Sequence, residues 1–215
     1  RTCVRVLGEL ESAEQVLAAE HLEPAGRLRV DLPALYGRLK VMPLLLEFAQ
    51  RHAAVQPQVS FTDRFVDVVD EGIDVAVRIG GSVQLPAGLG QRLLGRERLV
   101  FCASPAYLER RGAPDSLQAL AGHDAVAYGR TDAGMSAWQS SAGAIAVQPR
   151  MVLGDGEAVV AAVMAGCGIA QLATWMVEAP LRDGHLLRLL PGAEVDGLPL
   201  HLVWPRSRQL LPKVD

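Results

Sequence analysis

The chain of 215 residues has little of what several common classes of protein require. It has only three cysteines, Cys3, Cys102 and Cys167. So few thiols, odd in number and far apart, predict no disulfide framework and favour a reducing compartment, the cytoplasm. A redox pair between Cys102 and Cys167 is the alternative to ordinary buried apolar thiols. No apolar run reaches the ~20 residues of a membrane span, and no signal peptide is visible at the start.

The chain also has no excess of positive charge. The formal net charge is -3, the isoelectric point is near 6.0, and the short charge runs "RERLVF" and "LERRG" form no basic stripe. A chain that binds nucleic acid by itself is usually basic overall or carries such a stripe. We therefore expect no specific DNA binding by this chain alone.

Motifs of catalysis and of cofactor binding are also missing. The five histidines are scattered singly, no Cys/His spacing suits a metal ion, and neither a G-x-S-x-G elbow nor a G-x-x-x-x-G-K phosphate loop is present. Asp155 and Glu157 could form an acid pair, but their place ahead of "AVVAAVMAG" is typical of helix N-terminal capping. We expect no catalytic residue, no metal and no cofactor.

Apolar residues are abundant, at half of the chain, and their spacing predicts alternating strands and helices. In the first half, strands are expected at "GRLRVDLP", "QVSFTDRF" and "DVAVRI". Helices are expected from Leu35 to Ala54 and from Val66 to Glu71, the second closed by Gly72 as its C-terminal cap. Pro43 either starts the regular helix or kinks its first turn. This order predicts an α/β unit with a largely parallel sheet.

The second half repeats the pattern. Strands are expected from Leu99 to Ala103, at "AVAYG", at "GIAQLA" and at "LPLHLVWP", and "AIAVQPRMVL" predicts two strands in a hairpin or meander. Helices are expected at "DGEAVVAAVMAG" and "ATWMVEAPLRDG". The chain therefore predicts two similar α/β halves, with crossovers at Leu99–Ser104 and Leu200–Pro205. Residues 1–22 predict an amphipathic helix whose apolar stripe has no partner nearby in the sequence.

Ligands of parallel α/β sheets bind outside the carboxyl ends of the strands. One such strand ends on Arg78, a cation followed by flexible glycines, which favours a ligand contact there. The alternative is that Arg78 only forms an ion pair with Asp74 or Asp67. The strand ends of the first half lie at Pro33–Leu35, Asp63–Arg64 and Arg78–Gly81.

Several segments, in order, resemble those of one family. "GRLRVDLP" is similar to its opening strand, and "VDVVDEGIDVAVRIG" is similar to its segment D-L-V-x-E-G-x-D-V-A-I-R-I-G. "LGRERLVFCASPAYLERRGAPDSLQALAGHDAV" and "DGEAVVAAVMAGCGIAQLATWMVEAPLRDGHLLRLLP" resemble its later segments. Together they resemble the effector-binding domain of LysR-type transcriptional regulators over nearly the whole chain. Ala173 departs from the pattern, because the family often has Pro at that place.

The resemblance implies a fold and a division of the chain. The expected fold is α/β, with two Rossmann-like lobes of the type II periplasmic-binding-protein architecture joined by two crossover strands. Residues 1–24 would be the end of a dimerising linker helix, 25–100 with 204–215 would form lobe I, and 101–203 would form lobe II. The family's winged helix-turn-helix is missing from this chain, so promoter DNA would be bound only through that missing domain.

The resemblance also implies a function. A small cytoplasmic effector would bind between the lobes of a homodimer or homotetramer, with no membrane involved, and would act on the DNA-binding domain. The predicted strand ends carry Arg64, Arg78 and Arg130, and helices are expected to start nearby, near Leu35 and Gly156. These features favour an anionic or strongly polar effector. A periplasmic-type solute-binding protein and an enzyme on the same fold are the alternatives. The expected ligand contacts are Pro33, Ala34, Leu35, Tyr36, Asp63, Arg64, Arg78, Ser104, Tyr128, Gly129, Arg130, Asp155 and Gly156.

Overall fold

The computed structural model describes residues 23–214 except 65, 82–85, 131–133 and 136. The helix predicted over residues 1–22 lies outside this part of the chain. The chain divides into two compact units, one formed by the described residues up to 95 and from 199 onward and the other by those within 96–198. Two long strands, β4 (Leu89–Ala103) and β12 (Val195–Pro205), carry the chain from one unit to the other. The boundaries predicted near residues 100 and 204 fall on these same strands.

Unit 1 is built on a parallel sheet. Strand β1 lies between β2 and β3, with Val30 opposite both Val59 and Val75, and β12 pairs antiparallel with the outer side of β3. The predicted strand–helix order with a largely parallel sheet is confirmed here. Besides its parts of β4 and β12, the unit contains β1 (Gly26–Leu32), α2 (Ala34–Tyr36), the π-helix η2 (Gly37–Val41), α3 (Met42–Arg51), β2 (Val55–Phe61), β3 (Val75–Ile79) and the 3-10 helix η4 (Arg206–Arg208).

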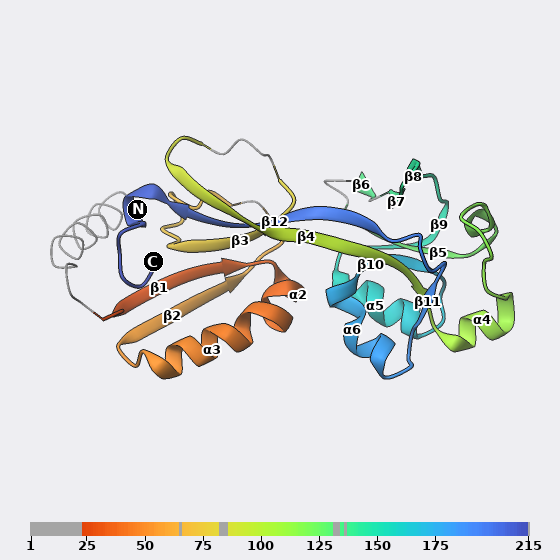
Figure 1. The fold of residues 1–215 in the computed structure, drawn as a ribbon, viewed down its shortest axis with the longest axis horizontal. Helices are drawn as coiled ribbons and strands as arrows, with labels where there is room; N and C mark the ends of the chain where they lie inside the picture. Colours follow the sequence, from red (N-terminus) through yellow and green to blue (C-terminus); the bar gives the residue numbers. More distant parts are fainter. Residues whose placement is uncertain (1–22, 65, 82–85, 131–133, 136, 215) are drawn as a thin grey trace. The chain divides into compact units, whose positions relative to one another are not determined.

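One helical stretch, α2–η2–α3, covers one face of this sheet (Figure 1). Its inner side chains, among them Leu45 and Phe48, pack on the buried residues Leu28 and Val30 of β1. Glycine is needed at the start of the stretch, because a Cβ atom at Gly37 would lie 2.6 Å from the Cβ atom of Leu32. Pro43 lies in the first turn of α3, where it starts the regular helix. This is the first of the two alternatives predicted for it.

The opposite face of the sheet is covered by the connection between β2 and β3. The short helix predicted from Val66 to Glu71 is wrong, since this segment forms turns and not a regular helix. Asp67 explains the difference, because its Oδ1 atom accepts hydrogen bonds from the N–H groups of Val69 and Asp70 and so satisfies the backbone locally. Gly72 ends the turn with φ of +67°, a left-handed conformation, but the described residues before it form no helix for it to cap as predicted.

The segment after β12 completes unit 1. Leu211 is fully buried, and Arg208 Nη1 donates to Asp74 Oδ1 at 2.6 Å. The other oxygen of Asp74 accepts from the N–H of Arg29 at 2.8 Å. The last residues therefore fasten the start of β3 to the middle of β1.

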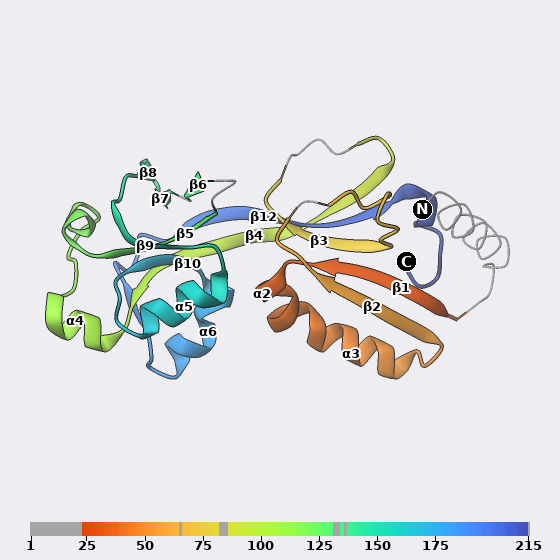
Figure 2. The same cartoon turned by 180° about the vertical axis from the view of Figure 1, so that it is seen from behind.

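Unit 2 is a second layered α/β unit. Strand β4 pairs antiparallel with β10 and β11, and β5 pairs parallel with β9. Helices α5 and α6 pack on one face around Val159 and Val177, as Figure 2 shows for their placement, and α4 packs on the other face through Tyr107. Its elements are α4 (Pro105–Arg111), η3 (Gln118–Gly122), β5 (Ala125–Arg130), β6 (Gly134–Met135), β7 (Trp138–Ser140), β8 (Gly143–Ile145), β9 (Pro149–Leu153), α5 (Gly156–Met164), β10 (Ala170–Ala173), α6 (Thr174–Arg182) and β11 (Leu187–Leu189), with the remaining parts of β4 and β12.

Two details of unit 2 bear on the sequence predictions. The two strands expected in "AIAVQPRMVL" do exist, but their predicted pairing in a hairpin or meander is wrong, because β8 pairs with β7 whereas β9 pairs with β5. Cys102 and Cys167 are both free thiols. Cys102 is fully buried in the core, where burial raises the pKa of its thiol to about 12. The prediction of a buried apolar thiol is confirmed for Cys102.

Candidate functional site

The carboxyl ends of β1, β2 and β3 meet at one edge of the sheet of unit 1, because the three strands run parallel. Two loops are joined there. Asp63 Oδ1 accepts a hydrogen bond from the N–H of Ala34 at 3.0 Å, and the N–H of Thr62 donates to the Leu32 carbonyl at 2.9 Å. The structure therefore brings together these predicted contacts of unit 1: Pro33, Ala34, Leu35, Tyr36, Asp63 and Arg64.

Arg64 is the exposed cation of this edge. Its backbone N–H donates to Thr62 Oγ1 at 3.1 Å, which fixes the turn that carries it. Its guanidinium group has no partner within the described residues. A complete guanidinium fork is thus available to a ligand at the strand ends.

Arg78 of β3 is in a different environment. The residue is 7% exposed, and its Nη1 atom donates to Asp31 Oδ2 at 2.6 Å and to the Val77 carbonyl at 3.0 Å. Ser60 Oγ donates in turn to Asp31 Oδ1. An ion pair was one of the two predicted alternatives for Arg78, but the predicted acidic partners are wrong, because the carboxylate is that of Asp31.

The second terminal nitrogen of Arg78 has no such partner. Its Nη2 atom is buried and makes no hydrogen bond within the described part of the chain. A buried N–H group without an acceptor is costly, so such an atom points to an acceptor supplied from outside the chain, such as a water molecule or a ligand. Asp31 therefore fixes the guanidinium, and the N–H groups of its Nη2 atom stay unsatisfied within the described residues.

Asp31 and Ser60 are the polar residues that the sequence argument missed. Asp31 is 1% exposed and lies on β1, between β2 and β3, where an unpaired carboxylate would be strongly unfavourable. Its place between Val30 and Leu32 could have indicated a buried charge, because a carboxylate within an apolar, buried strand requires a partner. The identity of the partner depends on strand register, which a single sequence does not state.

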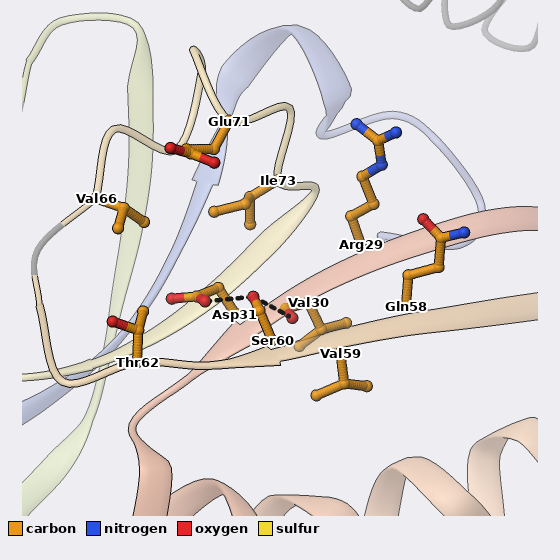
Figure 3. A pocket seen from close by; sticks show the side chains of 10 residues that line it. All are labelled: Arg29, Val30, Asp31, Gln58, Val59, Ser60, Thr62, Val66, Glu71 and Ile73. Carbon is orange, nitrogen blue, oxygen red and sulfur yellow. Dashed lines mark hydrogen bonds between the residues drawn. The ribbon is translucent and has the colours of Figure 1, made fainter.

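A pocket of about 520 Å³ opens on the face of β1 and β2 that lies away from α3 (Figure 3). Asp31 and Ser60 lie at its floor, joined by the hydrogen bond drawn in the figure. The connection between β2 and β3 supplies the wall above them, with Val66, Glu71 and Ile73. The pocket is lined by Arg29, Val30, Asp31, Gln58, Val59, Ser60, Thr62, Val66, Glu71 and Ile73.

Unit 2 has a comparable edge. Strands β5 and β9 run parallel with Tyr128 opposite Leu153, so Tyr128, Gly129, Asp155 and Gly156 lie at the same strand ends. Asp155 caps α5, since its Oδ1 atom accepts from the N–H of Ala158 at 2.8 Å, and the predicted capping role is confirmed. The side chain of the remaining predicted contact, Arg130, lies outside what the structure describes.

Ser104 is not brought to that edge. It is buried at the end of β4, where its hydroxyl caps α4 by accepting from the N–H of Tyr107 at 3.4 Å. Strand β4 runs antiparallel to β10, which a parallel bridge from Ile169 to Ala125 links to β5. Ser104 therefore lies at the opposite edge of unit 2 from Tyr128.

Two classes of site find no support among the described residues. Within that part of the chain, no group of three His, Cys, Asp or Glu residues is placed to hold a metal ion. None of the helices described is long and apolar enough to cross a lipid bilayer.

The two α/β units and their polar strand ends define a two-lobed domain of the ligand-binding class found in bacterial regulators. The chain matches the family of the LysR substrate binding domain over residues 21–215 and belongs to it. It is the effector-binding domain of a LysR-type transcriptional regulator, as the resemblance implied, and this membership favours the regulator over the solute-binding alternative.

Individual relatives agree. The uncharacterized HTH-type transcriptional regulator YhjC of Escherichia coli K12 is 32% identical over 222 residues, which cover 98% of this chain and 71% of that protein. The structure of CrgA, a LysR-type regulator from Neisseria meningitidis, superposes with a TM-score of 0.80 at 26% identity and covers 100% of this chain and 73% of its own. The effector domain of AmpR from Pseudomonas aeruginosa, at 22% identity and a TM-score of 0.69 over 85% of this chain and 87% of its own, shares the fold.

Proposed function

We propose that this domain senses a small anionic or strongly polar effector at the strand-end edge of unit 1, and that binding acts on the DNA-binding domain of the regulator. The observation that carries the proposal is the buried Nη2 atom of Arg78, which lacks an acceptor within the described residues next to an edge that also holds the unpaired guanidinium group of Arg64. Both groups can donate to an oxygen atom of a ligand.

The two arginines would contribute differently. Arg64 is exposed and presents its full fork, so it suits a carboxylate or phosphate group bound bidentately. Arg78 is already neutralised by Asp31, so it suits one further oxygen atom and adds orientation more than charge. Asp63 occupies the N–H of Ala34 at the start of the helical stretch, and an anionic effector would have to bind beside it or displace it. Further contacts are proposed at the strand ends of unit 2, from Tyr128, Gly129, Arg130, Asp155 and Gly156. Ser104 is not proposed as a contact, because its hydroxyl caps α4.

Calorimetry with an identified effector tests this proposal. Native mass spectrometry of the purified chain would name compounds that co-purify, and a panel of small carboxylates screened by thermal shift would serve if none does. We expect Arg64→Ala to weaken binding by at least about tenfold, as for loss of a hydrogen bond to a charged group. We expect a similar loss from Arg78→Lys, which keeps the charge beside Asp31 but removes the free N–H.

The matched control is Arg51→Ala. Arg51 is an exposed arginine of the same unit that pairs with Glu47 at the far end of α3, so its removal should leave effector binding unchanged. If Arg64→Ala and Arg78→Lys both bind the effector as the parent does, the proposed edge is not the binding site.

We also propose that the domain acts in the cytoplasm as a homodimer or homotetramer. Three leucines of the helical stretch, Leu39, Leu44 and Leu46, expose 47%, 65% and 56% of their surface. Large apolar side chains exposed on a helix are typical of a protein–protein contact. A second copy of the chain is the proposed partner, because LysR-type regulators oligomerise.

A further inference from the structure

The pocket on the face of unit 1 has charges that the proposed effector contacts do not use. Three of its lining side chains, those of Arg29, Gln58 and Glu71, make no hydrogen bond or ion pair within the described residues. None of the predicted contacts at the strand ends lines this pocket. The pocket therefore has its own unsatisfied polar groups, although Thr62 and the Asp31–Arg78 pair join it to the strand-end edge.

The pocket has one negative and one positive side chain without a partner among the described residues, and these decide which ligand charges fit it. At the floor, Asp31 is compensated by Arg78, so this pair adds little net charge. Glu71 and Arg29 remain as one free anion and one free cation, and no ion pair joins them. A ligand that satisfies both must carry one positive and one negative group and be neutral overall.

The two charges lie at different ends of the pocket. Strand register sets Arg29 beside Gln58, and two positions further along it sets Asp31 beside Ser60. Two strand positions correspond to about 7 Å along the sheet. Figure 3 shows Glu71 and Asp31 toward one end and Arg29 and Gln58 toward the other. The strand positions of Arg29 and Asp31 therefore lie close enough for one small ligand to reach both.

The backbone also makes room for the cation. The Nη1 atom of Arg29 would lie 2.7 Å from a Cβ atom at Gly72, so any other residue there would crowd the guanidinium group. Gly72 also has φ of +67°, which disfavours other residues. The glycine next to Glu71 thus leaves the guanidinium group of Arg29 in its observed place.

We propose that this pocket is a second ligand site, for a zwitterionic amino acid with an uncharged side chain. The ammonium group would be held by Glu71, with the outer lone pairs of Asp31 and Ser60 as further acceptors. The carboxylate group would be held by Arg29 and Gln58. Val66 and Ile73 provide an apolar wall for the side chain, and a volume of about 520 Å³ is ample for it.

The test uses the full chain and the twenty common L-amino acids as probes. Thermal shift would rank them, and calorimetry at millimolar concentrations would measure the strongest. The same measurement would be repeated with two analogues of that amino acid, the amine that lacks the carboxylate group and the acid that lacks the ammonium group. We expect a neutral amino acid to bind and each analogue to bind at least about tenfold more weakly.

Variants of the pocket supply the second measurement. Arg29→Gln and Glu71→Gln should each weaken amino-acid binding by about tenfold or more. Arg27→Gln, on the same strand but outside the pocket, and Glu47→Gln, on α3, are the matched controls and should bind as the parent does. Near-ultraviolet circular dichroism would show that each variant keeps its packing.

The outcomes separate this site from the proposed effector edge. Arg64→Ala should leave amino-acid binding unchanged. If no amino acid binds, if both analogues bind as tightly as the amino acid, or if Arg29→Gln and Glu71→Gln have no effect, the pocket is not such a site. If binding is lost with Arg64→Ala instead, the amino acid is an effector of the strand-end edge and the pocket proposal is wrong.

Discussion

Arg78 and Asp31 lie in the interior of unit 1, and their side chains are 9% and 2% exposed. Breaking a buried pair leaves one charge without compensation and out of contact with water. Loss of either Arg78 or Asp31 alone should therefore destabilise the fold, whatever the pair contributes to binding. Ser60 completes the arrangement through its hydrogen bond to the same carboxylate.

We predict that Asp31→Ala lowers the free energy of unfolding by ~3–5 kcal/mol, because it leaves the Arg78 guanidinium buried and unpaired. The change would be measured as a lower midpoint of urea unfolding. An apolar double replacement, Asp31→Leu with Arg78→Met, should recover most of the loss. As a control, Glu47→Ala removes an exposed pair with Arg51 and should cost under ~0.5 kcal/mol. A loss in Asp31→Ala no larger than that of the control would contradict the prediction.

At this scale the sequence identified a residue but not its environment. Arg78 stood out because a cation ends an otherwise apolar strand. Its partner lies 47 residues earlier in the chain and meets it only because β1 and β3 pair in one particular register. Register is decided by how whole strands pack, so the nearer acids Asp74 and Asp67 were natural but wrong predictions.

Helix α5 is stabilised at its first turn by one side chain, that of Asp155. Asp155 begins the helix with an extended backbone and binds the N–H of Ala158 with its carboxylate. We predict that Asp155→Ala lowers the free energy of unfolding by about 1 kcal/mol, since an N–H group and the helix dipole lose their partner. Asp155→Ser should keep most of that stability, because a serine hydroxyl also caps. Thermal or urea unfolding of the two variants measures this, and equal stability of Asp155→Ala and the parent would contradict it.

Long elements were predictable and short ones were not. The helical stretch from Ala34 to Arg51 carries enough turns for its apolar period to be read without its neighbours. Strands such as β7, β8 and β11 have three residues each and exist through their pairing, which a single sequence does not display. The helix predicted after β2 was wrong for a different reason, because the carboxylate of Asp67 competes with helical hydrogen bonding.

The helical stretch of unit 1 matters again at the scale of the whole molecule. If its exposed leucines form a contact between copies, the chain should sediment as a dimer or larger at tens of micromolar. We predict that Leu44→Lys with Leu46→Lys shifts it toward monomer, because burying two charges opposes association. Gln56→Lys, an exposed change on β2, is the control. A parent chain that sediments as a monomer would count against self-association.

The family and the two α/β units could be predicted for the whole molecule, because many weak segment resemblances occur in the right order. The polar pocket on β1 and β2 could not be predicted. Its residues come from two strands and a connecting turn, and they share a pocket only after the sheet has formed. The sequence places Arg29, Gln58 and Glu71 far apart and marks none of them as special.

The two long strands β4 and β12 also bear on how the chain is made on the ribosome. Residues 96–198 form unit 2 as one continuous segment, whereas unit 1 needs residues from both sides of it. Because domains tend to fold as units during synthesis, unit 2 can be complete while unit 1 still lacks the strand that pairs Leu202 with Val77. Unit 1, whose first strand is translated long before, has to wait for Leu211 to emerge and seal it. Arg64, Arg78 and the pocket all lie in unit 1, so a nascent chain would be competent to bind through them only after β12 and Leu211 have been translated.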